Sequence, residues 1–377
     1  MKAVKYLPTF LFVGFIFTMM VLWLVLPKDS YSPQEKRTLA AFPECNTETL
    51  TDGTFQKSLD TWLSDHMPAR SFFVGLNANY DLLSGRNGAK GIYLGQDNYL
   101  FPKPVQDGET LLKNAGYIQE FADDLDNIPV YMTVVPSSGA VNSDKLPAVH
   151  ETYRDAEWIT AFREKLGKNV RFVDVQQDFA KAAAKRQLYY KTDHHWTSYG
   201  AFECYRLLGA AMGYTPLAER DFDKEKVKGF YGTSYAKAAL WFLPPDTVEL
   251  WSNHQQPDDA VTVAIHDGQD NKTGSSYFFR EQLKNDDKYP VFLDGNHSLV
   301  RITNTAAEGG TLIVIKDSYA HTLVPFLSQH YRNIVMVDLR YYKKEVSALV
   351  EQEKADAVLL LYSLDNLAAD TNLSYLF

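Results

Sequence analysis

The chain has 377 residues, of which 45% are hydrophobic, 14% aromatic and 23% charged. This length and composition exclude an intrinsically disordered chain, a collagen-like repeat and a disulfide-dense miniprotein, and they fit one large α/β domain or two smaller ones. The formal net charge of −9 and the lack of a run of five or more Lys/Arg residues disfavour a nucleic-acid partner. Cys45 and Cys204 are the only cysteines, which excludes a cysteine zinc site and leaves their pairing open.

The first predicted element is a membrane-spanning helix. From Tyr6 to Leu26 the chain carries no charge and is long enough to cross a hydrocarbon layer of roughly 30 Å. Lys2 and Lys5 precede this segment, whereas Lys28 beyond it is offset by Asp29, so we expect the amino end in the cytoplasm and the rest of the chain outside it. A cleaved secretory signal is the alternative, but the apolar stretch is longer than usual and no small-x-small cleavage site follows it. We predict an uncleaved, single-pass anchor in the cell membrane.

After the anchor, the chain divides into a spacer and a globular domain. Residues 1–28 form the predicted cytoplasmic tip and transmembrane signal-anchor, 29–52 a polar spacer, and 53–377 an extracytoplasmic catalytic domain. Between about 217 and 310 the helical periodicity is lost, and short apolar runs alternate with Asn, Asp, Gly and Pro. We predict a loop- and strand-rich insertion there, on the substrate side of the domain.

Strands and helices alternate on both sides of this insertion. In chain order, the patterns predict helices over 53–86 broken at Pro68, a hairpin over Gly91–Phe101, a helix over 109–125, a strand over Ile128–Val135, a helix over 155–167, a strand over Val170–Val175, then Thr311–Ile315, a helix from Ala320, Ile334–Asp338, a helix near 343–352, and Ala357–Leu361. Such alternation predicts an α/β fold with a mostly parallel sheet covered on both faces. Ligands of these sheets bind beyond the carboxyl ends of the strands.

A tetrapeptide, Asp193-His194-His195-Trp196, carries the first candidate catalytic groups. In an extended segment Asp193 and His195 point the same way, so the carboxylate can hold the imidazole and stabilise it after it takes a proton. Thr197 is expected to cap the helix that follows. Two alternatives stay open: Asp193 caps a turn while the imidazoles bond to backbone, or the histidines ligate a metal, for which spacing marks no third ligand.

The candidate nucleophile is Ser318, which follows the predicted strand Thr311–Ile315 and opens the next helix. Its backbone N–H near a helix start could face a developing oxyanion. The alternative is an ordinary N-cap serine. Ser234, in Gly232-Thr233-Ser234-Tyr235, is a rival nucleophile that lacks a core strand before it.

Arg340 and Tyr341 end the next predicted strand, at the same edge of the sheet. They are candidates for binding a sugar polymer, Arg340 through its guanidinium and Tyr341 by stacking. A helix-capping ion pair of Arg340 is the alternative.

These motifs, together with Ser32–Leu39, Asp65-x-x-Pro68-x-Arg70 and Lys316-Asp317-Ser318-Tyr319, resemble the DHHW protein family, which is named for the tetrapeptide. That family is similar to the SGNH-hydrolase-like proteins and to the alginate O-acetylation proteins of bacterial envelopes. The resemblance implies a three-layer sandwich with Asp193 as acid, His195 as base and Ser318 as nucleophile. It keeps Ser234 open as the alternative nucleophile, since relatives carry their serine in Gly-Thr-Ser-Tyr. It also implies a membrane-bound O-acyltransferase partner.

The sequence therefore predicts a membrane-anchored extracytoplasmic serine acyltransferase or acetylesterase that acts on a cell-surface or secreted polysaccharide through an acyl-serine. The predicted substrate-binding residues are Arg340, Tyr341, Trp196 and His194, and no cofactor or metal is expected. The alternative is a catalytically inert polysaccharide-binding or scaffold protein, which would be favoured if Ser318 and His195 lay beyond side-chain reach of each other. A metal-dependent hydrolase using His194 and His195 is the third possibility.

Overall fold

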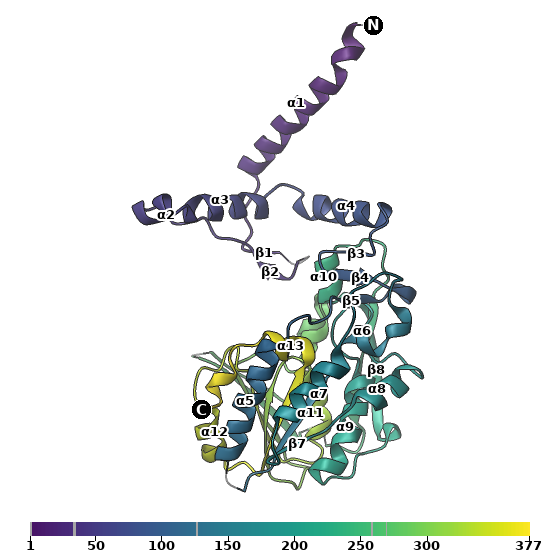
Figure 1. Cartoon of the computed structure of the whole chain (residues 1–377), viewed down its shortest axis with the longest axis vertical. Helices are drawn as coiled ribbons and strands as arrows, with labels where there is room; N and C mark the ends of the chain where they lie inside the picture. The colour runs from purple at the N-terminus through teal and green to yellow at the C-terminus, as the bar shows by residue number, and fades with distance from the viewer. Residues whose placement is uncertain (1, 33–34, 126, 258, 269) are drawn as a thin grey trace. The chain divides into compact units, whose positions relative to one another are not determined.

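The computed structural model describes residues 2–32, 35–125, 127–257, 259–268 and 270–377 (Figure 1). The chain divides into two compact units. The first comprises Met1–Lys90 and Ala236–Phe242, and the second comprises Gly91–Tyr235 and Leu243–Phe377.

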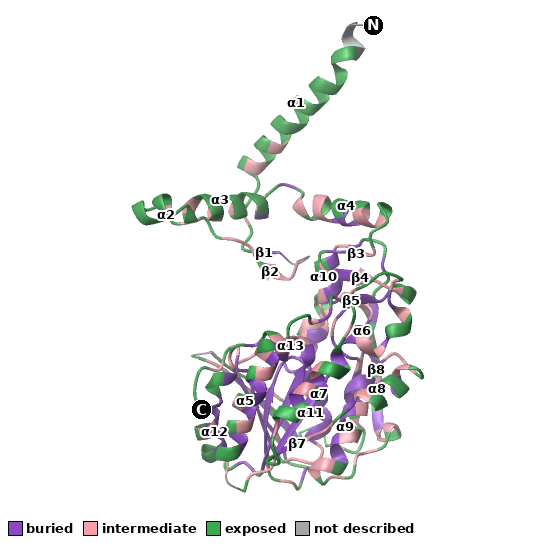
Figure 2. Ribbon diagram, in the orientation of Figure 1, coloured by how far each residue is buried: buried purple, intermediate pink, exposed green. Residues whose placement is uncertain are grey.

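The first unit begins with the predicted apolar helix. Helix α1 (Lys2–Val25) contains a candidate membrane span over Lys5–Val25, none of which is buried in the protein (Figure 2). An exposed helix with this composition needs an apolar solvent, because water would meet a continuous surface of Leu, Phe, Val, Ile and Met. Among the described residues this is the one helix that is long and apolar enough to cross a membrane, and it fits a single-pass anchor.

Short elements follow α1 in the first unit. They are β1 (Tyr31–Ser32), β2 (Arg37–Thr38), α2 (Thr47–Thr51), α3 (Thr54–Asp65), α4 (Arg70–Leu83) and β3 (Gly88–Ala89). Helices α3 and α4 lie on either side of Pro68, because proline cannot continue a helix. Asp65 at the end of α3 accepts hydrogen bonds from the Arg37 guanidinium and from the backbone N–H of Ala40 at 2.9 Å. The bond from Arg37 holds the pKa of Asp65 below its ordinary value and ties the spacer to α3.

The second unit is built on an eight-stranded sheet with the order β11-β10-β12-β14-β13-β15-β6-β7. Its strands are β6 (Val130–Val135), β7 (Val170–Phe172), β10 (Val261–Asp267), β11 (Asp270–Gly274), β12 (Leu299–Asn304), β13 (Thr311–Lys316), β14 (Asn333–Val337) and β15 (Ala357–Ser363). The run from β14 to β7 is parallel, whereas β10, β11 and β12 pair antiparallel. The predicted α/β fold with a mostly parallel sheet is confirmed, and the antiparallel strands come from 217–310.

Both faces of the parallel strands are buried. In β13, Leu312 and Val314 belong to one hydrophobic cluster, and Ile313 and Ile315 belong to the other. The first cluster includes residues of α8 (Gln176–Ala183), α9 (Ser198–Met212) and α11 (Ala320–Leu327), and the second includes residues of α5 (Glu109–Asp124), α7 (Asp155–Lys165), α12 (Val346–Gln352) and α13 (Leu364–Ala369). This is why the strand sequences are continuous apolar runs rather than alternating ones (Figure 2).

The remaining elements of the second unit lie outside the main sheet. A hairpin of β4 (Ile92–Leu94) and β5 (Leu100–Pro102) forms where the turn residues predicted it, and α6 (Ser138–Val141) follows β6. Strands β8 (Phe222–Phe230) and β9 (Asp246–Asn253) pair as an antiparallel ribbon, and the helix α10 (Thr233–Ala238) begins in the segment between them.

Candidate active site

Two loops meet at the carboxyl ends of the parallel strands. Ser318 lies directly between β13 and α11, and the Asp193–Trp196 loop precedes α9. Thr197 caps α9 as predicted, because its side chain accepts a hydrogen bond from the backbone N–H of Gly200. The Asp193–Trp196 loop belongs to the irregular segment 184–197 between α8 and α9, and backbone hydrogen bonds from Tyr190 to His195 at 3.1 Å and from Thr197 to Leu188 at 2.8 Å hold it in place.

The two loops bring Ser318, His195 and Asp193 into one hydrogen-bonded line. The distance between His195 Nε2 and Ser318 Oγ is 2.6 Å, and that between His195 Nδ1 and Asp193 Oδ1 is 2.5 Å. Because an ionised carboxylate only accepts, Nδ1 carries the proton toward Asp193 and Nε2 is left to accept from the Ser318 hydroxyl. Ser318 and His195 lie within reach of each other, whereas the inert-scaffold alternative would be favoured if they lay apart.

Both oxygens of Asp193 are occupied by donors. Oδ1 also accepts from the backbone N–H of His195 at 2.9 Å, and Oδ2 accepts from the N–H of Thr233 at 2.6 Å and from its hydroxyl at 2.9 Å. Asp193 is only 1% exposed, and these donors stabilise its charge in a site that water does not reach. Gly232 lies so close that a Cβ there would overlap the Asp193 side chain.

The Gly232–Tyr235 motif therefore donates hydrogen bonds to Asp193 and packs against it. Its Thr233 is a site residue that the sequence reasoning missed, although the motif itself was visible. Ser234 is buried, and the two ring nitrogens of His195 are bonded to Asp193 and Ser318 instead. The geometry supports Ser318 over Ser234 as the partner of the imidazole.

Tyr289, at the start of the short 3₁₀ helix Tyr289–Val291, covers the imidazole. Its ring stacks on His195 with centroids 3.8 Å apart and planes 9° apart, and its hydroxyl donates to the backbone oxygen of Ser318 at 3.0 Å. Burial raises the pKa of Tyr289 well above its ordinary value, so it stays a neutral donor. Tyr289 lies in the predicted insertion at 217–310, where no short sequence motif marked it as a site residue.

Trp196 is fully buried. Its indole N–H donates to the hydroxyl of Thr322 at 2.6 Å and to the backbone oxygen of Tyr319 at 3.1 Å. The prediction that Trp196 binds substrate is therefore wrong for this structure: a side chain with no exposed surface cannot stack on a sugar, and it instead fastens the loop to α11.

His194 lies beside His195 at the surface of the site. Its side chain is 31% exposed, its Nδ1 is 2.6 Å from the hydroxyl of Thr233, and its ring centroid is 3.9 Å from that of His195. The Tyr319 hydroxyl also donates to its backbone oxygen. The predicted contact of His194 with substrate fits this exposed position and stays a prediction.

Asp317 fixes the backbone next to Ser318. Its Oδ2 accepts from the N–H and hydroxyl of Ser363 and from the amide of Asn366, each at 2.8 Å, and its Oδ1 accepts from the N–H of Tyr319 at 2.9 Å. These bonds join the ends of β13 and β15, so Ser318 sits on a loop with little freedom.

Arg340 and Tyr341 lie after β14. The Arg340 guanidinium donates to both oxygens of Asp338, at 2.8 and 2.6 Å, and Lys316 donates to Asp338 at 2.9 Å. Burial alone would raise the pKa of Asp338, but these two cations outweigh it and hold that pKa below its ordinary value. The ion-pair alternative thus describes the Arg340 guanidinium, while Tyr341 is 52% exposed and remains a candidate for stacking on a sugar.

Asp193, His194 and His195 could also hold a metal ion, since one ligand atom from each lies within 4.8 Å of the others. For His195 to ligate, however, it would have to release either Asp193 or Ser318. Both oxygens of Asp193 already accept hydrogen bonds, so a metal ion bound to this carboxylate would have to displace some of those donors. The arrangement favours proton transfer from Ser318.

Comparisons with known proteins agree with the fold. A crystal structure of a DHHW family protein from Eubacterium siraeum is 23% identical, has a TM-score of 0.65, and is matched over 76% of this chain and 95% of that chain. A structure of Bacillus cereus PatB1 with a sulfonyl adduct is 21% identical, with a TM-score of 0.63 and coverage of 75% and 97%.

A curated Pseudomonas putida protein named "Probable alginate O-acetylase AlgJ" is 25% identical over 223 residues. The match covers 57% of this chain and 57% of that protein, so the chain spans just over half the length of this relative. The model of the DHHW protein family matches residues 35–97 and 126–337, which include the Asp193–Trp196 loop and Ser318. Since this match takes in well over half of the sequence, the chain belongs to the DHHW protein family.

Proposed function

We propose that this protein is a membrane-anchored, extracytoplasmic serine acyltransferase or esterase that acts in O-acetylation of a cell-surface or secreted polysaccharide. The observation that carries the proposal is the buried line from Ser318 Oγ through His195 to Asp193, with distances of 2.6 and 2.5 Å. The name of the Pseudomonas putida relative, an alginate O-acetylase, supports the acetyl group and the polysaccharide.

In the first half-reaction, Ser318 Oγ attacks the carbonyl carbon of an acetyl donor while its proton passes to His195 Nε2. The backbone N–H of Ser318, two residues before α11, is assigned to stabilise the negative charge on the carbonyl oxygen. Asp193 stabilises the imidazolium. When the tetrahedral intermediate collapses, the bond to the donor oxygen breaks, and that oxygen takes the proton from His195 and leaves acetyl-Ser318.

In the second half-reaction, a sugar hydroxyl or water gives its proton to His195 Nε2 and attacks the acetyl-Ser318 carbonyl. Collapse breaks the bond to Ser318 Oγ, which takes the proton back from His195. Transfer and hydrolysis differ only in the acceptor.

The placement of this chemistry is part of the proposal. Residues 1–28 would be a cytoplasmic tip and anchor, 29–52 a spacer, and 53–377 an extracytoplasmic, SGNH-like three-layer domain with the insertion at 217–310. Helices on both sides of the sheet support the layered architecture. The family resemblance supports a membrane-bound O-acyltransferase as the partner that supplies acetyl groups.

The test uses the detergent-solubilised full chain and a chromogenic acetyl ester. We expect turnover by the wild type and by Ser234→Ala, and its loss in Ser318→Ala and His195→Ala. An aryl sulfonyl fluoride should modify Ser318, as located by peptide mass spectrometry. Wild-type turnover in both Ser318→Ala and His195→Ala would refute the assigned roles, and loss confined to Ser234→Ala would move the nucleophile there.

A further inference from the structure

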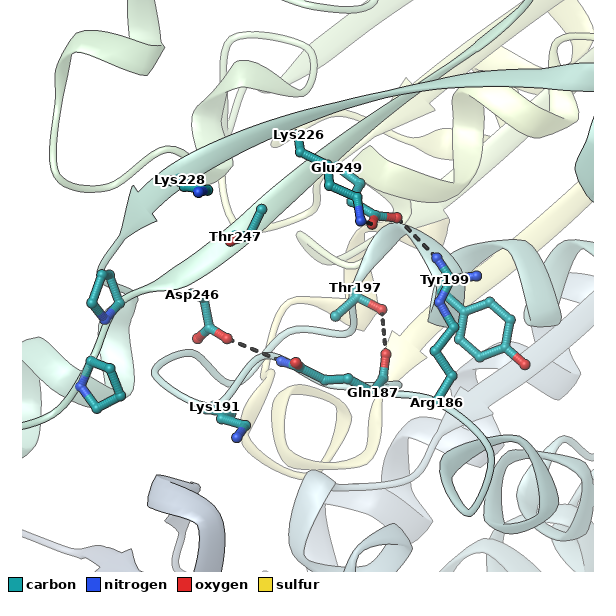
Figure 3. A pocket seen from close by; sticks show the side chains of 12 residues that line it. Arg186, Gln187, Lys191, Thr197, Tyr199, Lys226, Lys228, Asp246, Thr247 and Glu249 are labelled. Carbon is teal, nitrogen blue, oxygen red and sulfur yellow. Dashed lines mark hydrogen bonds and ion pairs between the residues drawn. The ribbon is translucent and has the colours of Figure 1, made fainter.

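A second cavity lies in the catalytic unit, outside the Ser318 site. It has a volume of about 550 Å³ and lies between the β8–β9 ribbon and the loop that runs from Gln187 to Thr197 (Figure 3). We call it the hairpin pocket. It is lined by Arg186, Gln187, Lys191, Thr197, Tyr199, Lys226, Lys228, Pro244, Pro245, Asp246, Thr247 and Glu249.

The hairpin pocket carries an excess of positive charge in a protein whose net charge is −9. Four cations line it against two carboxylates. One of the carboxylates, Glu249, accepts from Arg186 at 3.0 Å and lies 3.5 Å from the Lys226 ammonium. Arg186 also donates to Glu219 at 2.7 Å. These acids offset Arg186 and Lys226, so that pair of cations contributes little net charge to the cavity.

The other carboxylate is committed to the protein wall. Asp246 is buried, and it accepts from Gln187 at 3.0 Å and from both the N–H and the hydroxyl of Thr192 at 2.7 Å. Among the residues that the structure describes, no ion pair joins Lys191 or Lys228 to a carboxylate, and the Lys191 ammonium lies over the ring of Tyr99, 5.3 Å from its centroid. These two lysines are the surplus charge of the hairpin pocket.

The rest of the lining suits a sugar ring. Pro244 and Pro245 supply apolar surface, and Thr247 and Gln187 offer side-chain hydrogen-bonding groups (Figure 3). Tyr199 is buried, and the Arg186 guanidinium covers its ring 4.5 Å from the centroid. Carbohydrate sites combine an aromatic or apolar platform with a few polar groups, and a cation adds selectivity for acidic units.

The hairpin pocket is also joined to the catalytic loop. Thr192, held by Asp246, directly precedes Asp193, and its hydroxyl accepts from the N–H of Gly232 at 3.2 Å. The wall of the hairpin pocket and the carboxylate of the Ser–His–Asp line therefore share one short, buried network.

We propose that the hairpin pocket binds an acidic unit of a glycan, its carboxylate or phosphate held by Lys191 and Lys228 and its ring packed against Pro244 and Pro245. It is a binding site separate from Ser318. That the glycan is the acetyl acceptor rests on the proposed function; the binding itself does not.

Binding is measured by calorimetry on the full chain carrying Ser318→Ala, so that no turnover enters the result. The probes are an oligouronate, a polyol-phosphate oligomer and a neutral gluco-oligosaccharide. We expect one of the two anionic probes to bind, more weakly as salt is raised, and the neutral one not to. Which anionic probe binds distinguishes a uronate polymer from a phosphate polymer as the source.

The test variant carries both Lys191→Gln and Lys228→Gln. The matched control is Lys344→Gln, because Lys344 is an exposed lysine beyond β14 that does not line the hairpin pocket. We expect the double variant to lose about tenfold in affinity and the control to lose none. Equal affinity in the double variant and the control, or equal binding of the neutral probe, would overturn the proposal. Glycan binding without ester turnover by the wild type would instead overturn the proposed catalysis and leave the hairpin pocket standing.

Discussion

Replacing Asp193 with Asn tests whether its charge, rather than its shape, supports the imidazole. The amide has the size of the carboxylate but offers donors on one side. Asp193 now accepts from His195 on one oxygen and from Thr233 on the other. In the variant, one of these two residues must face an amide N–H. If that residue is His195, its Nδ1 has to accept, Nε2 then carries the proton, and Ser318 has no base.

The expected loss can be worked from the geometry. With Nδ1 and Oδ1 2.5 Å apart, the centres of the imidazolium and the carboxylate are about 4 Å apart. At an effective dielectric constant of about 20, two opposite unit charges at that distance attract by about 4 kcal/mol. Because the imidazolium exists only after Ser318 has given up its proton, this attraction lowers the barrier. Its removal should reduce kcat about a thousandfold.

The assay is turnover of a chromogenic acetyl ester, with kcat and KM determined separately. We expect the loss in kcat, with labelling of Ser318 by a sulfonyl fluoride slowed in parallel. Asp178→Asn, a matched change at an exposed position of α8, should leave kcat unchanged, and both variants should keep the thermal midpoint of the wild type within a few degrees. A folded Asp193→Asn protein whose kcat stays within threefold of the wild type would refute the reasoning.

Two further predictions concern neighbouring groups. Gly232→Ala should reduce turnover at least tenfold, because its Cβ would displace the Asp193 carboxylate. Gly116→Ala on α5, where a Cβ meets open space, should keep activity and raise the free energy of unfolding by up to about 1 kcal/mol. Equal turnover in the two variants would contradict this prediction. Burial raises the pKa of Asp365 to about 7, so the native state holds this proton more tightly than the unfolded chain does, and stability from this group is present below about pH 4 and lost as the pH rises through 7. Asp365→Asn should therefore be the more stable protein at pH 8, by at most about 4 kcal/mol in urea unfolding, and a difference that does not grow from pH 5 to pH 8 would count against it.

Local sequence was enough to predict the parts of the site that lie on regular elements. Ser318 follows a continuous apolar strand and opens a helix, and parallel strands of that kind place their carboxyl ends at one edge. Asp193 and His195 are two residues apart, so their mutual geometry is nearly a local property. Their approach to Ser318 is not local, and it needed the fold: the pair is joined across a sequence separation of 123 residues.

The sequence reasoning failed where a side chain's surroundings decide its role. An aromatic residue next to a catalytic pair resembles a sugar platform, yet Trp196 packs inward because Thr322 and the Tyr319 backbone accept its indole N–H. Likewise, nothing in the local pattern around Tyr289 shows that its ring will stack on His195. Residues of an irregular segment carry no periodicity from which their direction could be predicted.

The segment between 217 and 310 contributes directly to the site. A carboxylate as buried as Asp193 is costly unless several donors compensate its charge, and the neighbouring His195 supplies only half of those seen here. Thr233 supplies the other half, Tyr289 covers the imidazole, and Asp246 holds Thr192 next to Asp193, all from the segment between 217 and 310. That segment therefore both compensates the buried charge of Asp193 and forms one side of the hairpin pocket. A ligand that moves the wall of the hairpin pocket would also move the surroundings of the carboxylate on which the proposed proton transfer depends.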